Sequence, residues 1–388
     1  MKRKNIDTKI KKMISITLII MLLLVIGCKQ EKEKNSPIDE SNENNELTIG
    51  LLATLTGTAA VHGTHVVIGA EKAVEEINAR GGNIKLIIED NENTPVAGLD
   101  AYHKIILNDP DVIFSTMSGS TKAIVPLAVE AGIPVLTSLT YADFRDYDTV
   151  YQYFQTTEDL AEIAAKFFAE KNISKIGLLA LNIEAGHALM DITKPKFEKE
   201  GIEVVGLEYY MPEDIDHRTQ ILKLAENSPE AIYVFDLRPD KIVKELKEQF
   251  NGIIVFTDTP IATNQHKTIP ELEGVYAASQ FYMIEGTEEN KKFNELFGDI
   301  KESSSNNNKS NSSNLKAGVN AEAGFGYDVV YLIWKAYQNV DKQTTLADSI
   351  TELKTFKGLA GEINLSSSHK PSIPVKMVKI TNKKLMVE

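Results

Sequence analysis

The sequence predicts an α/β fold in which a parallel sheet has helices packed on both of its faces. Three observations support this prediction. Short apolar runs have the length of buried strands, segments with apolar residues at helical spacing separate them, and glycine, proline and asparagine mark the turns. Strands that alternate with helices of about 10–15 residues are typical of parallel sheets, because a parallel connection needs a crossover. The 388 residues leave room for two domains.

The first part of the chain gives a regular series of these elements. Apolar runs predict strands at 47–52, 84–88, 112–114, 134–136 and 151–155. Helical spacing predicts helices at 66–77, 95–108 and 122–129. A loop of small residues at 55–63 separates the first strand from the first helix. The fifth strand is also expected to cross into a second series of strands and helices.

The second series begins with a helix whose apolar face contains Leu160 and Phe167. Further strands are predicted at 175–181, 202–207, 231–235 and 253–256, and a strand at 274–281 is expected to lead back to the first series. The helix at 327–337 would then pack with the first series again. Residues 375–380 and 384–387 predict a C-terminal hairpin. A run rich in serine and asparagine at 302–314 predicts a flexible surface insertion without a role in a binding site.

A run of small and hydroxyl residues stands where the third strand is expected to turn into a helix. It contains Ser118, Gly119, Ser120 and Thr121. The first N–H groups of a helix have no partner within the helix and carry a partial positive charge. Such a corner can therefore bind a carboxylate or a phosphate. The alternative is that Ser118 or Ser120 only caps the helix.

The first 27 residues have the organisation of a secretory signal peptide. A basic stretch precedes an apolar run at 13–26. As a helix this run would measure about 21 Å, less than the roughly 30 Å of a bilayer core. Leu-Val-Ile-Gly-Cys at 24–28 resembles a bacterial lipobox, so we expect lipid on Cys28; a tilted membrane helix with a chance cysteine is the alternative. The polar residues 28–46 predict a disordered tether.

The composition argues against several classes of function. A net charge of −13 argues against nucleic acid as a partner and against broad adhesion to anionic lipid. The single cysteine excludes an internal disulfide and a cysteine-based zinc site. His62 and His65 lack a third ligand nearby in the sequence, so no metal and no other cofactor is expected. The chain has no Gly-x-Ser-x-Gly elbow, phosphate loop or dinucleotide fingerprint, which makes an enzyme a distant alternative.

Several motifs, taken in chain order after the lipobox, resemble a known family. They are Leu-Thr-Gly-Thr-Ala-Ala-Val-His-Gly at 55–63, Gly-Ala-Glu-Lys-Ala-Val-Glu-Glu-Ile-Asn-Ala-Arg-Gly-Gly at 69–82, Ile-Ile-Glu-Asp-Asn at 87–91, Ser-Gly-Ser-Thr at 118–121 and Glu-Ala-Gly-Ile-Pro-Val at 130–135. The ordered set is similar to the substrate-binding proteins of branched-chain amino-acid ABC transporters, the leucine/isoleucine/valine-binding type. The resemblance covers residues 47–388 in element order.

The resemblance implies the type I periplasmic binding protein fold. This fold has two Rossmann-like lobes with parallel central sheets, joined by three crossing strands. We expect the first lobe at 47–152 and 281–356, including the insertion, and the second lobe at 153–280 and 357–388. The ligand would lie in the cleft between the lobes, at the carboxyl ends of the strands, and closure about the hinge would trap it.

The resemblance also implies roles for residues of the first lobe. Ser118 falls where the family holds the ligand carboxylate through a hydroxyl and a backbone N–H. Leu139, Thr140 and Tyr141 fall on the next loop, where a backbone carbonyl and a hydroxyl residue usually meet the α-ammonium and carboxylate groups. Tyr141 replaces the small hydroxyl residue expected there. His62 falls where an aromatic side chain often covers the ligand.

Three residues of the second lobe receive roles in the same way. Asp258 matches the acidic residue that pairs with the ligand ammonium, and its alternative is a turn or helix-cap aspartate. Ala185 stands where a tyrosine commonly closes over the ligand. Arg238 stands near another expected tyrosine and can hold a second carboxylate bidentately; its alternative is a surface ion pair with Asp236 or Asp240. These departures favour a polar, acidic or larger ligand as strongly as a leucine-like one.

The resemblance therefore implies an extracytoplasmic lipoprotein that captures a small amino-acid-like or anionic solute and delivers it to an ABC permease. Lipid on Cys28 would hold the protein to a bacterial membrane. A ligand sensor of the same fold, which signals to a membrane receptor, would use the same cleft and is the main alternative.

Overall fold

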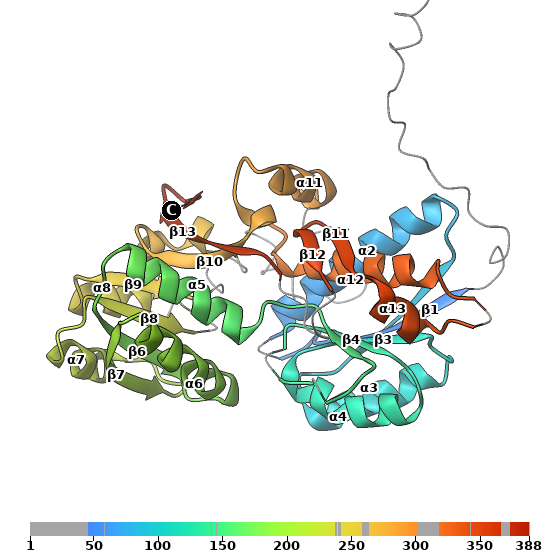
Figure 1. Ribbon diagram of the computed structural model, residues 1–388, viewed down its shortest axis with the longest axis horizontal. Coiled ribbons are helices and arrows are strands. Elements are labelled where there is room, and N and C mark those ends of the chain that lie inside the picture. The colour runs from blue at the N-terminus through green and yellow to red at the C-terminus, as the bar shows by residue number, and fades with distance from the viewer. Residues whose placement is uncertain are drawn as a thin grey trace, which may run out of the picture. The chain divides into compact units, whose positions relative to one another are not determined.

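The computed structural model describes residues 46–57, 59–140, 142–144, 146–236, 239, 242–257, 264–300, 318–341, 343–365 and 373–387. The expected signal peptide, Cys28, the tether before residue 46 and the insertion lie outside these residues, as do Tyr141, Arg238 and Asp258. The described residues form an α/β fold with parallel central sheets, which confirms the predicted fold class (Figure 1). No helix in this part of the chain combines the length and the apolar character that crossing a bilayer requires.

The first sheet has five parallel strands in the order β2-β1-β3-β4-β5. In chain order its elements are β1 (Leu47–Ala53), α2 (Ala60–Ala79), β2 (Ile84–Asp90), α3 (Pro95–Ile106), β3 (Val112–Thr116), α4 (Ser118–Glu130), β4 (Val135–Ser138) and β5 (Val150–Gln152). Strands β1 and β3 are neighbours, with Leu52 opposite Ser115. The loops that follow these strands therefore leave the sheet at the same edge, where open α/β sheets bind ligands.

The side chains of β1 alternate between two apolar cores, one on each face of the first sheet. Ile49 belongs to the core that contains Val66 of α2, whereas Leu52 belongs to the core that contains Ile105 of α3. Helix α12 (Glu322–Tyr337) packs alongside α2, although the two helices are far apart in the sequence (Figure 1). Burial on both faces explains why these strands are continuous apolar runs without polar alternation.

The second sheet has seven strands in the order β14-β13-β10-β9-β8-β6-β7. Its elements and the connections after them are α5 (Thr157–Glu170), β6 (Lys175–Leu181), α6 (Glu184–Lys199), β7 (Glu203–Tyr210), α7 (Arg218–Glu226), β8 (Ala231–Phe235), α8 (Val243–Gln249), β9 (Ile253–Phe256), α10 (Gln265–Thr268), η2 (Pro270–Leu272), β10 (Tyr276–Gln280), η3 (Phe281–Met283), α11 (Glu288–Phe297), β13 (Val375–Thr381) and β14 (Lys384–Val387). Helix α13 (Leu346–Glu352) packs against α12 instead. Strands β6 to β10 pair in parallel, and β13 and β14 form the predicted antiparallel hairpin at the edge.

The structure differs from the prediction at the first helix. Helix α2 begins at Ala60, so His62 and Gly63 lie in its first turn and not in the predicted loop at 55–63. The first turn lies directly against the end of β1, where a Cβ atom on Gly63 would be 1.9 Å from the carbonyl oxygen of Thr54. Glycine at this position is therefore what lets the helix start so close to the strand.

A further hairpin, β11 (Thr355–Gly358) with β12 (Gly361–Asn364), is absent from the prediction, and the expected lobe boundary at 356 falls inside it. The buried carboxylate of Asp328 on α12 holds its turn, because it accepts hydrogen bonds from the N–H groups of Leu359 at 2.7 Å and Ala360 at 3.2 Å. The hydroxyl of Tyr153, just after β5, donates to the same carboxylate at 2.8 Å.

We predict that Asp328 makes the stability of the fold depend on pH. Burial raises the pKa of the Asp328 carboxyl to about 6, although its three hydrogen bonds act in the opposite direction. In the unfolded chain the pKa is about 3.9, so the folded state binds the extra proton between about pH 4 and pH 6. The contribution of this group to stability is full below pH 4 and is lost as the pH rises through 6, by up to about 3 kcal/mol.

Urea unfolding at several pH values between 4 and 7 measures this effect. Asp328→Asn should remove the part of the pH dependence that belongs to this carboxyl, whereas Asp299→Asn, at an exposed position, should leave it in place. Equal slopes of unfolding free energy against pH in the wild type and Asp328→Asn would contradict the prediction.

Candidate functional site

The carboxyl ends of β3 and β4 bring the hydroxyl groups of Ser118 and Thr140 together. The Oγ of Ser118 lies 2.9 Å from the Oγ1 of Thr140, although the two residues are 22 positions apart in the sequence. Ser118 is half-buried at the start of α4, and Thr140 is buried. The Thr140 hydroxyl also accepts a hydrogen bond from the N–H of Ala142 at 3.2 Å. Two of the predicted site residues thus form one polar group at the edge of the first sheet.

Helix α4 starts without a side-chain cap, as far as the described residues show. Its N-cap is Met117, whose φ of +68° lies in the left-handed region. The N–H of Thr121 donates to the carbonyl of Met117 at 3.2 Å and begins the helical series of hydrogen bonds. The N–H groups before it lie at the positive end of the helix dipole. In the described part of the chain, neither the Ser118 nor the Ser120 side chain caps this helix, so the structure does not support the capping alternative.

The hydroxyl groups of Ser120 and Thr121 point into the protein, which differs from the expectation that they face a ligand. Both residues are fully buried. The Ser120 hydroxyl donates to the carbonyl of Thr116 at 2.9 Å, and the Thr121 hydroxyl lies 2.8 Å from that of Ser115. Gly119 is needed for packing, because a Cβ there would lie 2.7 Å from the carbonyl oxygen of Asn93. The small residues in this run therefore allow close packing where β3 turns into α4.

The loop after β4 turns at Leu139, whose φ is +55°. A left-handed conformation costs a residue with a side chain about 1 kcal/mol or more, so the surrounding contacts must hold it. One of these contacts is the side-chain amide of Gln152, which donates to the carbonyl of Thr140. Leu139 is half-buried and packs against the apolar core. The loop that carries Thr140 is therefore fixed from β5.

The side chain of Asn91 joins the carboxyl ends of β1 and β3, a role that the sequence analysis did not assign. Its amide nitrogen donates to the carbonyls of Leu52 at 3.1 Å and Thr116 at 3.0 Å. Its amide oxygen accepts from the hydroxyl of Thr54 at 2.6 Å and from the N–H of Asn93 at 3.0 Å. Asn91 is fully buried. The Glu-Asp-Asn motif at 89–91 marks the position, but only the folded sheet reveals what the amide bridges.

His62 and Ala185 occupy positions that correspond to that of Ser118. Each lies in the first turn of a helix that follows a strand, with His62 in α2 after β1 and Ala185 in α6 after β6. The Nδ1 of His62 lies 2.5 Å from the Oε1 of Glu322 on α12. Ala185 is half-buried against the core. Glu322 lies 260 positions after His62, so no local pattern in the sequence indicates this pair.

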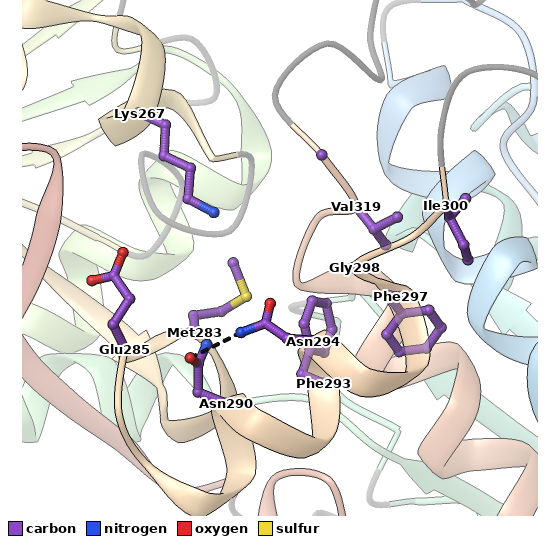
Figure 2. A pocket seen from close by; sticks show the side chains of 11 residues that line it. Lys267, Met283, Glu285, Asn290, Phe293, Asn294, Phe297, Gly298, Ile300 and Val319 are labelled. Carbon is purple, nitrogen blue, oxygen red and sulfur yellow. Dashed lines mark hydrogen bonds between the residues drawn. The ribbon is translucent and has the colours of Figure 1, made fainter.

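A pocket of about 270 Å³ lies among the elements that follow β9. Figure 2 shows Lys267 and Glu285 on one side of it and the apolar side chains of Phe297 and Val319 on the other. Of the residues that the resemblance assigns to ligand binding, none that the structure describes lines this pocket. We therefore build the candidate site on the edge of the first sheet.

The fold, with its polar group at the carboxyl edge of the first sheet, is that of α/β proteins that bind ligands where parallel strands end. The chain belongs to the periplasmic binding protein family, whose profile matches residues 46–384. The Leu/Ile/Val-binding protein BraC3 of Rhizobium johnstonii is 28% identical over 205 residues, which are 50% of this chain and 56% of that protein. The Leu/Ile/Val-binding protein of Escherichia coli is 23% identical over 246 residues, 59% of this chain and 65% of that one. The chain spans somewhat more than half the length of the curated relatives it matches.

Solved structures share the fold over most of the chain. The branched-chain amino-acid transporter substrate-binding protein LivJ of Streptococcus pneumoniae, in complex with isoleucine, has a TM-score of 0.74 at 21% identity and covers 89% of this chain and 99% of its own. A solute-binding protein of Rhodopseudomonas palustris in complex with benzoate has a TM-score of 0.72 at 18% identity, with 88% and 95% covered. These matches bear out the predicted fold, the type I periplasmic binding protein, and they are of solute-binding proteins and not of enzymes.

We predict that Asn91→Ala destabilises the protein by about 2–4 kcal/mol, because the Thr54 hydroxyl and the Asn93 N–H lose their acceptor and two buried carbonyls each lose one donor. Urea unfolding monitored by circular dichroism measures the loss. Asn108→Ala is the matched control, since Asn108 is exposed and its side-chain amide donates to the carbonyl of Lys104 in the preceding helix α3; it should change the stability by less than about 0.5 kcal/mol. A similar small effect of Asn91→Ala would show that the bridge does not hold the sheet edge.

Proposed function

We propose that the protein captures a small solute that carries a carboxylate group, and that the start of α4 binds this group. The hydroxyl pair of Ser118 and Thr140 carries the proposal. Two hydroxyls in contact can reorient, so that one donates its proton to the other and the accepting hydroxyl donates its own proton to an incoming anion. The N–H groups at the start of α4 add further donors with a favourable dipole.

The ligands of the structural neighbours support a carboxylate as the recognised group. Isoleucine is bound in one neighbour and benzoate in another, and the carboxylate is the chemical group that these two molecules share. An ammonium group is present only in isoleucine. The proposal therefore assigns the common carboxylate to the edge of the first sheet and leaves the remainder of the ligand to the other residues.

Residues outside the described part of the chain complete the proposed site. Asp258 would pair with an ammonium group, Arg238 with a second acidic group, and Tyr141 would take part from the loop after β4. We propose that the solute lies between two lobes, divided as the sequence predicts, and that Ala185 and His62 face it. A ligand larger or more polar than leucine fits the replacement of a covering tyrosine by Ala185.

We further propose that the protein works outside the cytoplasm, attached to a membrane by lipid on Cys28, and hands its ligand to an ABC permease. The family to which the chain belongs is extracytoplasmic, and the permease is the partner that the resemblance to branched-chain amino-acid transport implies. Attachment through lipid would keep the binding protein close to the membrane while its body stays in water.

Thermal-shift measurements with matched ligand pairs test the binding site. Isoleucine and benzoate each have an amide partner, isoleucinamide and benzamide, in which an uncharged amide group replaces the carboxylate. A ligand of the folded state raises the melting temperature in proportion to RT ln(1 + [L]/Kd), so weak binding is also detected. We expect a rise with at least one carboxylate and none with its amide.

Ser118→Ala and Thr140→Val should each weaken binding of that carboxylate by about 10- to 100-fold, the effect of about 1.5–3 kcal/mol for a hydrogen bond to a charged group. Ser174→Ala is the control, because its hydroxyl is bonded to Glu230 near the amino end of β6. If both site variants bind as tightly as the control, the carboxylate binds elsewhere.

The attachment is tested by fractionation. We expect Cys28→Ser to move the protein from the detergent phase to the aqueous phase in a detergent partition and to end incorporation of labelled fatty acid. Asn35→Ser, in the same tether, should leave both properties unchanged. Membrane association that persists in Cys28→Ser would contradict a lipid anchor at this residue.

A further inference from the structure

Residues 318–322 form a junction between the pocket of Figure 2 and the first turn of α12 (Figure 2). The side-chain amide of Asn264 donates to the carbonyl of Val319 at 2.9 Å and to the Oδ1 of Asn320 at 3.2 Å. The hydroxyl of Tyr282 donates to the carbonyl of Ala321 at 3.1 Å. The junction is therefore held from two sides before the chain reaches Glu322, so the position of the Glu322 backbone is well defined.

Glu322 carries a carboxylate that is almost completely buried. Its side chain is 2% exposed, and one oxygen lies 2.5 Å from the Nδ1 of His62, whose side chain is 17% exposed. Among the described residues, the other oxygen has no hydrogen-bond partner. An ionised carboxylate in such surroundings is strongly disfavoured unless a cation balances it. A protonated His62 ring would donate a charge-assisted hydrogen bond to this oxygen.

Among the described residues, His65 is another titratable group near this carboxylate, and it lies one turn further along α2. Its Nδ1–H donates to the carbonyl of Val61 at 2.7 Å. Burial lowers the pKa of His65, against the opposing influence of Glu322, and nearby His62 lowers it further. His65 therefore stays neutral near pH 7, and His62 is the histidine of this pair that can supply the positive charge.

We propose that Glu322 is a positioning residue that keeps His62 protonated and oriented, so that the imidazolium attracts the anionic group of the ligand. This proposal rests on the proposed function, because it adds a charge to the same site. Helices α2 and α4 begin after the neighbouring strands β1 and β3, so His62 and Ser118 start from one edge of the sheet. The ligand class that follows is a solute with an anionic group, bound more tightly when His62 is charged.

Nuclear magnetic resonance of the full chain, labelled with ¹³C-histidine, tests the pairing without any ligand. The His62 signal is assigned with His62→Phe. We expect His62 in the wild type to lose its proton at least one pH unit above the ordinary value of about 6.5. In Glu322→Gln, which keeps the shape but not the charge, the midpoint should fall by at least one unit. Glu352→Gln, at an exposed helix end, should leave it unchanged.

The second measurement follows the affinity for benzoate and for isoleucine at several pH values between pH 6 and pH 8.5. In the wild type we expect affinity to fall about tenfold or more as His62 loses its proton, and in Glu322→Gln this fall should be centred at least one pH unit lower. His62→Phe should remove this pH dependence, while His62→Lys should restore tight binding at both pH values.

The outcomes separate this proposal from the proposed function. An unchanged His62 midpoint in Glu322→Gln would overturn the pairing. If the His62 midpoint shifts in Glu322→Gln but the pH dependence of ligand affinity stays the same, the role of His62 toward the ligand would be overturned. If neither benzoate nor isoleucine binds at any pH, the proposed carboxylate site fails and the ligand half of this inference fails with it, while the titration still decides whether Glu322 sets the charge of His62.

Discussion

The bridge that Asn91 makes between the ends of β1 and β3 is the contact on which the arrangement of the sheet edge depends. Backbone hydrogen bonds of a parallel sheet stop where the strands stop, so the loops beyond have no ladder to hold them. The buried amide replaces that ladder with bonds to Leu52 and Thr116. Helices α2 and α4 consequently start from a fixed frame. The hydroxyl pair at Ser118 and the ion pair at His62 are both built on it.

Binding of an anion at this edge of the sheet would depend on nearby groups and not on the net charge of the protein. The chain carries a net charge of −13, which repels anions at long range, but salt screens that repulsion beyond about 8 Å at physiological ionic strength. Within that distance the start of α4 presents donors on a helix dipole. An acidic protein with such a site can select a carboxylate while it resists non-specific binding of polyanions.

Periodicity was sufficient to predict most of the strands and helices, because burial on both faces makes central strands such as β1 and β8 nearly continuous apolar runs. The contact between Ser118 and Thr140 follows from the same pattern, since neighbouring parallel strands end at one edge. The start of α2 was missed because it depends on space beside Thr54, which a sequence does not display. Glu322 was missed because its partner His62 lies far away in the chain, and a buried glutamate in a helix has no distinctive neighbours.

Asp328 has a consequence for how the protein can move. One carboxylate accepts hydrogen bonds from the hydroxyl of Tyr153 next to β5 and from the N–H groups of Leu359 and Ala360 in the turn of the β11–β12 hairpin. Two stretches of chain more than two hundred residues apart are thereby fastened to the same rigid helix. They are thereby tied to each other through one carboxylate, so a motion that separates them must first break these hydrogen bonds.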